Sequence, residues 1–190
     1  MESIYLITMQ TETYVAKVIR FFTKKPYNHA SLAGDAGMRE LYSFCRTNPK
    51  FPLPATFNIE TQERFSRFQS VPCEIYEISV TVTQKQQFNE LMRHFIDNRE
   101  KYTYNSLGLG YMLFNIKRRS KNKFVCSQFV AYTLKRLGLK LKKPVSLCTP
   151  DDLRFLPESK LMYKGELQDY FTGKTPLVSK HNEPIPQTNN

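Results

Sequence analysis

Cys126 begins a stretch in which apolar side chains recur at helical spacing, at Phe129, Val130, Leu134 and Leu137. The pattern predicts a helix within 124–137 whose first turn carries the thiol on the inward-packing side. Free backbone N–H groups and the positive end of the helix dipole in that turn stabilise a thiolate and can bind an oxyanion. This is the environment that a cysteine nucleophile needs. A cysteine on an apolar helix face is, however, more often a small core residue.

A thiol nucleophile needs a base, and the chain contains three histidines. His181 lies in a C-terminal segment that is poor in apolar residues, and His94 is offset from the apolar stripe of its predicted helix. His29 begins a predicted strand and shares a face with the small Ser31 and Ala33, which leaves room for a helix end to approach. His29 is therefore the candidate base. The alternative is a hydrogen-bonded structural histidine.

A third polar group should orient the imidazole through its second ring nitrogen. In the strand predicted after the one with His29, Glu40, Tyr42 and Phe44 alternate onto one face. A carboxylate on an otherwise aromatic face needs a partner, because burying it unpaired is costly. Pairing with His29 across a hairpin would provide that partner, and we expect Glu40 in this role, with Tyr42 beside it. A Glu40 that points into solvent is the alternative.

The other three cysteines lack such a setting. Cys45, Cys73 and Cys148 lie on or beside predicted strands and turns, with no amphipathic helix after them. The chain has no CxxC pair and no histidine at zinc-ligand spacing, so the sequence predicts neither a metal site nor a cofactor. We also expect no disulfide framework, because an unexported chain keeps its thiols reduced.

Composition and net charge indicate the class of protein in which these candidate residues lie. The 190 residues are 41% hydrophobic and 13% aromatic, and they include 28 Lys+Arg against 17 Asp+Glu, a net charge of +11. These values favour a globular chain over a disordered one. No apolar run is long enough to span a membrane, and the start Met1-Glu2-Ser3 lacks the pattern of a secretory signal, so the prediction is a cytoplasmic protein.

The elements that must position the candidate residues follow from hydrophobic periodicity. Strands are expected over 3–9, 28–33, 39–45, 73–82 and within 160–170, and helices over 13–22, 83–96 and 124–137, with a helix start at 149–152. Gly34-Asp35-Ala36-Gly37 predicts a tight hairpin turn. Residues 47–72 contain several prolines and predict an irregular insertion with one short helix over 61–68. The prediction is one α+β domain over 1–173, with an antiparallel sheet packed against helices, and a disordered tail over 174–190.

The order of these parts resembles a known family. Tyr27-Asn28-His29-Ala30-Ser31 starts a strand, and Phe124-Val125-Cys126-Ser127-Gln128-Phe129-Val130 comes later, followed by Thr149-Pro150-Asp151-Asp152-Leu153. This arrangement resembles the circularly permuted branch of the NlpC-type papain-like superfamily, in particular YiiX/YebB-like proteins. Lecithin retinol acyltransferase is a more distant relative with the same order of histidine before cysteine. The resemblance runs from the first strand to about Phe155.

The resemblance implies a circularly permuted papain-like fold and a Cys–His pair with a third polar residue. Cys126 takes the role of nucleophile, His29 that of base and Glu40 that of orienting residue. The implied enzyme is a papain-like cysteine hydrolase or acyltransferase, a peptidase, an amidase or an enzyme of lipid acyl groups. It would attack an amide, ester or thioester bond through a thioacyl-enzyme, without a metal or organic cofactor.

The excess positive charge points to anionic partners. Lys117, Arg118 and Arg119 belong to a basic run just before the nucleophile helix, and together with Tyr42 they are candidate substrate-binding residues. They would attract an anionic peptide, lipid or small-molecule acyl substrate; the alternative is a solvated loop. Two other function classes remain: a nonenzymatic basic module that binds nucleic acid or anionic lipid, and an inactive papain-like relative. The sequence does not predict the oligomeric state.

Overall fold

The central strand β1 (Glu2–Met9) is apolar on both faces, so it must be covered on both sides. In the computed structural model, Ile4 and Leu6 enter one buried cluster, whereas Ile7 and Met9 enter another. The structure describes residues 1–11, 24–47, 55–105, 110, 116–117 and 121–174. Over these residues the chain is one mixed α+β unit.

The main sheet has six strands in the order β4-β3-β2-β1-β5-β8, and every neighbouring pair is antiparallel. The expected antiparallel sheet is therefore confirmed. Two short strands, β6 and β7, pair in parallel as a separate ribbon. The strands after β1 are β2 (His29–Ala33), β3 (Leu41–Arg46), β4 (Ala55–Glu60), β5 (Pro72–Val80), β6 (Thr103–Tyr104), β7 (Lys123–Phe124) and β8 (Ser159–Glu166).

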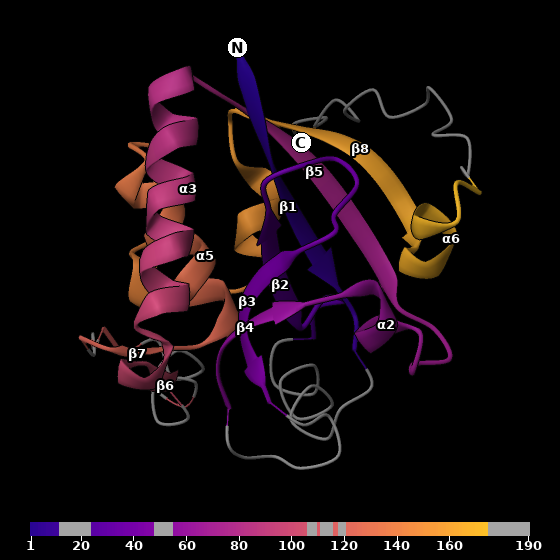
Figure 1. Ribbon diagram of the computed structural model, residues 1–190, viewed down its shortest axis with the longest axis horizontal. Coiled ribbons are helices and arrows are strands. Elements are labelled where there is room, and N and C mark those ends of the chain that lie inside the picture. Colours follow the sequence, from indigo (N-terminus) through magenta and orange to yellow (C-terminus); the bar gives the residue numbers. More distant parts are fainter. Residues whose placement is uncertain (12–23, 48–54, 106–109, 111–115, 118–120, 175–190) are drawn as a thin grey trace, which may run out of the picture.

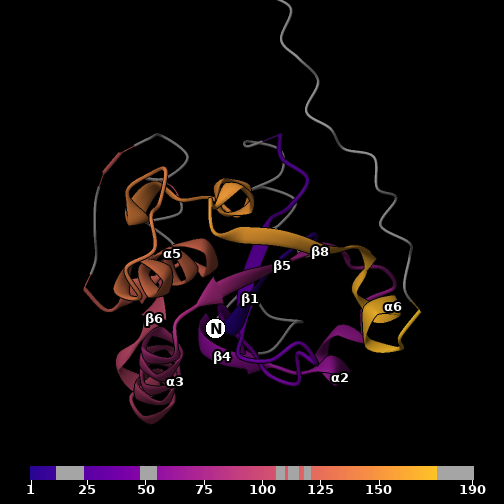
Figure 2. The same ribbon diagram turned by 90° about the horizontal axis from the view of Figure 1, so that it is seen from above.

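Helices cover the two faces of the sheet unequally (Figures 1 and 2). The long helices α3 (Val82–Asp97) and α5 (Cys126–Arg136) pack on one face, and the short α2 (Gln62–Phe65) and α6 (Leu167–Phe171) pack on the other. Three 3-10 turns complete the described elements, at Arg99–Lys101, Val145–Leu147 and Asp152–Phe155. Among the helices of the described residues, none is long and apolar enough to cross a membrane.

An aromatic cluster joins the two long helices to the sheet. Phe44 of β3 and Phe57 of β4 meet Phe95 of α3 and Phe129 of α5, with ring centroids 5.1–6.1 Å apart. All four are essentially buried. Rings in such edge-on and offset contacts add stabilisation to their large buried area. The cluster therefore anchors α5 against the strands that carry the candidate site.

The segment between 47 and 72 differs from expectation. Residues 55–60 form the edge strand β4, which pairs along its whole length with β3. The prolines before this strand indicate a loop, but proline is tolerated at the start of an edge strand, where an N–H is not needed. The expectation of an irregular segment is thus wrong for 55–60. The short helix is confirmed in reduced form as α2.

Two other boundaries are corrected. The hairpin between β2 and β3 is joined by residues 34–40, a longer connection than the expected four-residue turn, because Met38 is fully buried in the second cluster. Helix α3 is capped by Thr81, whose side chain and backbone exchange hydrogen bonds with Gln84. Val82, the last residue of the expected strand over 73–82, lies exposed in the first turn of that helix.

Most other expected elements are confirmed within a few residues, notably β1, β5, α5 and β8. Thr149 does start a turn: its Oγ1 accepts a hydrogen bond from the Asp152 backbone, and the Asp152 carboxylate accepts two from Thr149. The helix expected over 13–22 and the tail over 175–190 lie outside the described residues. The domain limit at residue 173 stays a prediction.

A buried ion cluster ties the chain after α5 to the sheet. The Arg154 guanidinium donates to both carboxylate oxygens of Glu74, at 2.6 and 3.0 Å, and to Asp151 at 2.7 Å. Tyr76 also donates to Glu74, whose side chain is 3% exposed. The Arg154 guanidinium stacks 5.1 Å from the Tyr27 ring centroid. The cluster thus reaches from β5 to the residues just before His29.

We predict that Arg154→Met destabilises the protein more than Arg154→Met combined with Glu74→Leu. The single change leaves the buried Glu74 carboxylate with the more exposed Lys164 as its remaining cation, so the loss of unfolding free energy is at most about 3–5 kcal/mol, the cost of a fully unpaired buried charge. The double change removes the buried carboxylate as well. Urea denaturation of the two variants and of Glu74→Leu measures the difference, and a double variant that is less stable than Arg154→Met would contradict this account.

Candidate functional site

Cys126 is the first residue of α5, as expected. Its side chain is buried, and the residue before it, Val125, is extended with ψ 165°. The Gln128 side chain accepts hydrogen bonds from the Val125 N–H and from the Asn105 amide. Asn105 in turn donates its backbone N–H to Phe124. The first turn of α5 is therefore held from outside by the segment that follows β6.

His29 is the first residue of β2 and is also buried, and the sheet fixes its backbone opposite Met9 of β1. The preceding residue adds a local clamp, because Asn28 exchanges side-chain hydrogen bonds with the backbone N–H and C=O of Thr11. His29 Nε2 lies 2.9 Å from one oxygen of Glu60 and 3.2 Å from the other. The imidazole is thus oriented by a carboxylate from β4.

Glu60 is the most heavily anchored polar residue of the site. Besides His29, one of its oxygens accepts hydrogen bonds from Ser31 at 2.9 Å and from Ser43 at 2.8 Å. The Arg64 Nε lies 3.5 Å from the other oxygen. Glu60 is 2% exposed, and a buried carboxylate is tolerated only when its charge and lone pairs are satisfied. Partners from the two strands β2 and β3 and from α2 together satisfy it.

The pKa shifts of this pair have opposite directions. Burial alone raises the pKa of Glu60, but the His29 charge, the hydrogen bond to His29 and the Arg64 charge outweigh it, so the pKa is lowered. Burial alone lowers the pKa of His29, but the Glu60 carboxylate and the Cys126 sulfur outweigh it, so the pKa is raised. The pair therefore favours an imidazolium beside a carboxylate.

Cys126 contributes to raising the pKa of His29, both through its charge and through a side-chain hydrogen bond. Since Nε2 faces Glu60, the geometry leaves Nδ1 as the ring nitrogen available to the sulfur. The structure therefore brings together Cys126 and His29, two of the three residues expected to form the site.

Glu40 does not take part in this cluster, and its expected pairing with His29 is wrong. It is exposed, and its carboxylate accepts a hydrogen bond from Tyr42 at 2.5 Å. The strand register explains the error. Ala33, which lies on the same face as His29, pairs with Leu41, so the odd-numbered residues of β3 point to the His29 face of the sheet. Glu40 alternates to the opposite face, because a shift of one residue reverses the side of a strand.

The other expected substrate-binding residues lie apart from the cluster. The Tyr42 ring packs against Phe57 and Phe88 on the helix side of the sheet. Lys117 is exposed, and Arg118 and Arg119 lie outside the described residues. Among the described residues, no contact joins Tyr42 or Lys117 to His29.

The sequence does not predict Glu60 as the partner of His29, because it does not predict the strand β4 that carries Glu60. A signal is present in the sequence: Thr56, Asn58 and Glu60 alternate with Ala55, Phe57 and Ile59. Polar residues on one face of a strand usually indicate solvent, but here that face lines the site. Ser31 and Ser43 are matching small donors on the neighbouring strands.

The remaining cysteines differ from Cys126 in their surroundings. Burial raises the pKa of the Cys73 and Cys148 thiols to about 12, and burial together with the Glu60 charge raises that of Cys45 still further. All four cysteines are free. These three thiols therefore stay protonated and unreactive at neutral pH.

We predict that Glu60→Gln lowers the pKa of His29. The carboxylate is the main cause that opposes burial, so without it desolvation should make the neutral ring dominant at a lower pH. NMR titration of ring-labelled histidine measures the shift, and Glu40→Gln is the matched control that should leave the His29 titration unchanged. An unaltered His29 titration in Glu60→Gln would contradict the assignment.

Comparison with known proteins gives similarity at the level of the fold. No protein-family model matches the chain, and no curated protein sequence matches it. The chain is similar to the crystal structure of the metalloprotein YiiX from Escherichia coli O157:H7, of the DUF1105 group. The two share 12% sequence identity and a TM-score of 0.57, over 86% of this chain and 97% of that one. This protein therefore has a YiiX-like α+β fold.

Proposed function

We propose that this protein is a cysteine-dependent hydrolase or acyltransferase with a circularly permuted papain-like arrangement. Cys126 is the nucleophile, His29 the base and Glu60 the residue that orients His29. One observation carries the proposal: His29 interacts with Cys126 and is hydrogen-bonded to a buried carboxylate held by three further donors. The fold similarity to YiiX supports the YiiX-like part of the resemblance seen in the sequence.

The first half of the reaction follows from this geometry. The proton of Cys126 resides on His29 Nδ1, in line with the imidazolium that the Glu60 carboxylate favours, and the thiolate sulfur attacks the carbonyl carbon of an amide, ester or thioester. The carbonyl oxygen gains charge, which the free N–H groups in the first turn of α5 can stabilise. The bond to the leaving group then breaks, and the leaving group takes the proton from the imidazolium. The product is a thioacyl-enzyme.

The second half reverses these roles. His29 takes a proton from water or from another acceptor, whose oxygen or nitrogen attacks the thioacyl carbon, and the C–S bond breaks. The proton stays on His29, so the released thiolate and the imidazolium restore the starting pair. Glu60 does not give up its charge at any step, because its role is to hold the ring orientation and to stabilise the imidazolium.

A nonenzymatic nucleic-acid module is disfavoured by where the aromatic residues lie. Base stacking requires exposed rings, but Phe44, Phe57, Phe95 and Phe129 are buried in the cluster beneath α5. The positive charge instead supports an anionic peptide, lipid or small-molecule acyl substrate.

The similarity to a protein called a metalloprotein raises the question of a metal. Within the part of the chain that the structure describes, no group of three or more His, Cys, Asp or Glu side chains is arranged to hold a metal ion. The donor set does not fit, so the proposed reaction includes no metal step.

We predict that electrophilic acyl probes of peptide and lipid type label Cys126 in the wild-type protein. Cys126→Ser should lose labelling and turnover, because the hydroxyl is a far weaker nucleophile beside an unchanged base. Cys73→Ala is the matched control and should keep both, since Cys73 is a buried, unreactive thiol. Mass spectrometry maps the labelled residue; labelling that persists in Cys126→Ser would overturn the proposal. A folded, unlabelled wild-type protein would indicate an inactive relative.

A further inference from the structure

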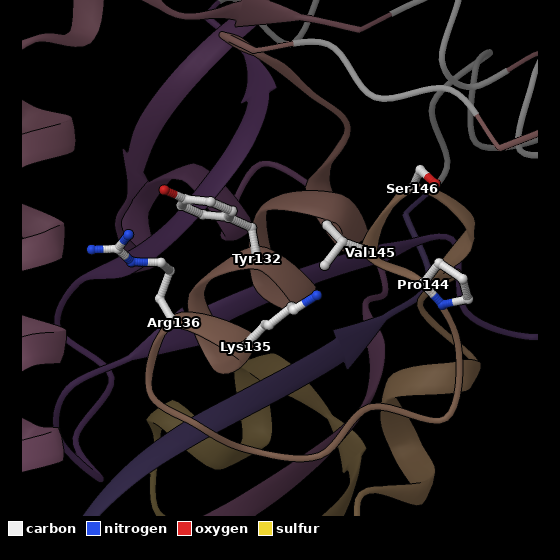
Figure 3. A pocket seen from close by; sticks show the side chains of 6 residues that line it. All are labelled: Tyr132, Lys135, Arg136, Pro144, Val145 and Ser146. Carbon is white, nitrogen blue, oxygen red and sulfur yellow. The ribbon is translucent and has the colours of Figure 1, made fainter.

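A pocket of about 560 Å³ lies behind the nucleophile helix. It is formed by the last two turns of α5 and by the segment around the 3-10 turn Val145–Leu147 (Figure 3). Its volume lies within the range of about 300–1,000 Å³ that is typical of small-molecule sites. The residues that line it are Tyr132, Lys135, Arg136, Pro144, Val145 and Ser146.

The pocket is not part of the candidate active site. Lys135 follows Cys126 by nine residues, about two and a half helical turns, so the two side chains leave α5 on opposite sides. Cys126 is buried, whereas Lys135 and Arg136 are exposed. The pocket is therefore separate from the proposed Cys126–His29 site.

The lining is cationic. It contains Lys135 and Arg136, and none of its six residues is acidic. Over the described ranges, neither cation forms an ion pair with a carboxylate. The rest of the lining supplies the hydroxyl groups of Tyr132 and Ser146 and the apolar side chains of Pro144 and Val145. Figure 3 shows the Lys135 side chain extending toward Val145.

The wall opposite α5 is preformed. Gln128, a buried residue of α5, donates a hydrogen bond at 2.9 Å to the backbone oxygen of Ser146. Leu147 is buried, and Cys148 is hydrogen-bonded to the backbone of Lys143. A ligand would meet this wall without first ordering it, which lowers the entropic cost of binding.

We propose that this pocket binds a phosphate monoester. The Lys135 and Arg136 side chains leave α5 in different directions (Figure 3), and both are exposed and long enough to turn toward one phosphate dianion. A guanidinium can contact two phosphate oxygens at once. Hydroxyl groups can donate to the remaining oxygens, and the Tyr132 ring with Pro144 and Val145 offers an apolar surface to the organic part of the ester. The same chemistry occurs in a soluble metabolite and in a lipid headgroup.

Calorimetric titration with glycerol 3-phosphate tests the soluble ester, and flotation with phosphatidylcholine vesicles containing phosphatidic acid tests the headgroup. Lys135→Gln combined with Arg136→Gln should weaken binding of the accepted probe by at least roughly tenfold, since two charge-assisted contacts are lost. The matched control is Arg93→Gln with Lys160→Gln, two exposed cations outside the pocket with the same loss of charge. Cys126→Ser should bind like the wild type, which separates this site from the proposed catalysis.

Basic residues in the last turn of a helix also stabilise the helix dipole. If that is their only role, the Lys135/Arg136 double variant loses stability in urea without losing affinity, and the proposal is overturned. Equal weakening in both double variants would show nonspecific charge attraction and would overturn it as well. Absence of saturable binding to either probe has the same consequence.

Discussion

The pairing of Glu60 with His29 is the interaction on which the rest of the site depends. A carboxylate that is almost entirely removed from water must have its charge compensated and its oxygens hydrogen-bonded. Here the compensation comes from β2, β3 and α2 at once, so these elements have to close on β4 for the fold to tolerate Glu60. The same closure fixes the orientation of the imidazole. Stability and the proposed chemistry therefore require the same geometry.

The nucleophile helix reaches this pair through packing on the other face of the sheet. Phe129 lies three residues after Cys126 and inserts between Phe44, Phe57 and Phe95. That contact fixes the position of α5, while Gln128 and Asn105 hold its first turn. The packing of these aromatic side chains thus fixes the position of the first residue of α5 relative to β2. The back of the same helix carries the cationic pocket, and Gln128 contacts both regions.

Some residues of the site can be predicted from a local sequence pattern, whereas others depend on how the strands pair. Cys126 and His29 are predictable because each lies in a local pattern, a helix start in one case and a strand with small neighbours in the other. Glu60 is not, because its strand follows several prolines and because its polar face looks like a solvated one. Alternation within one strand predicts Glu40 instead, but alternation does not specify which face of a neighbouring strand it joins. That relation depends on register.

The sequence by itself determined the α+β class, most strand and helix positions, the helix start at Cys126 and the strand start at His29, because these depend on periodicity and capping along a few neighbouring residues. Only the tertiary structure decided which carboxylate meets His29. The hairpin connection places Ala33 opposite Leu41, and the added edge strand brings Glu60 to the face that Ser31 and Ser43 share. Hydrogen-bond register between strands is a nonlocal property, and it exists only once the sheet is assembled.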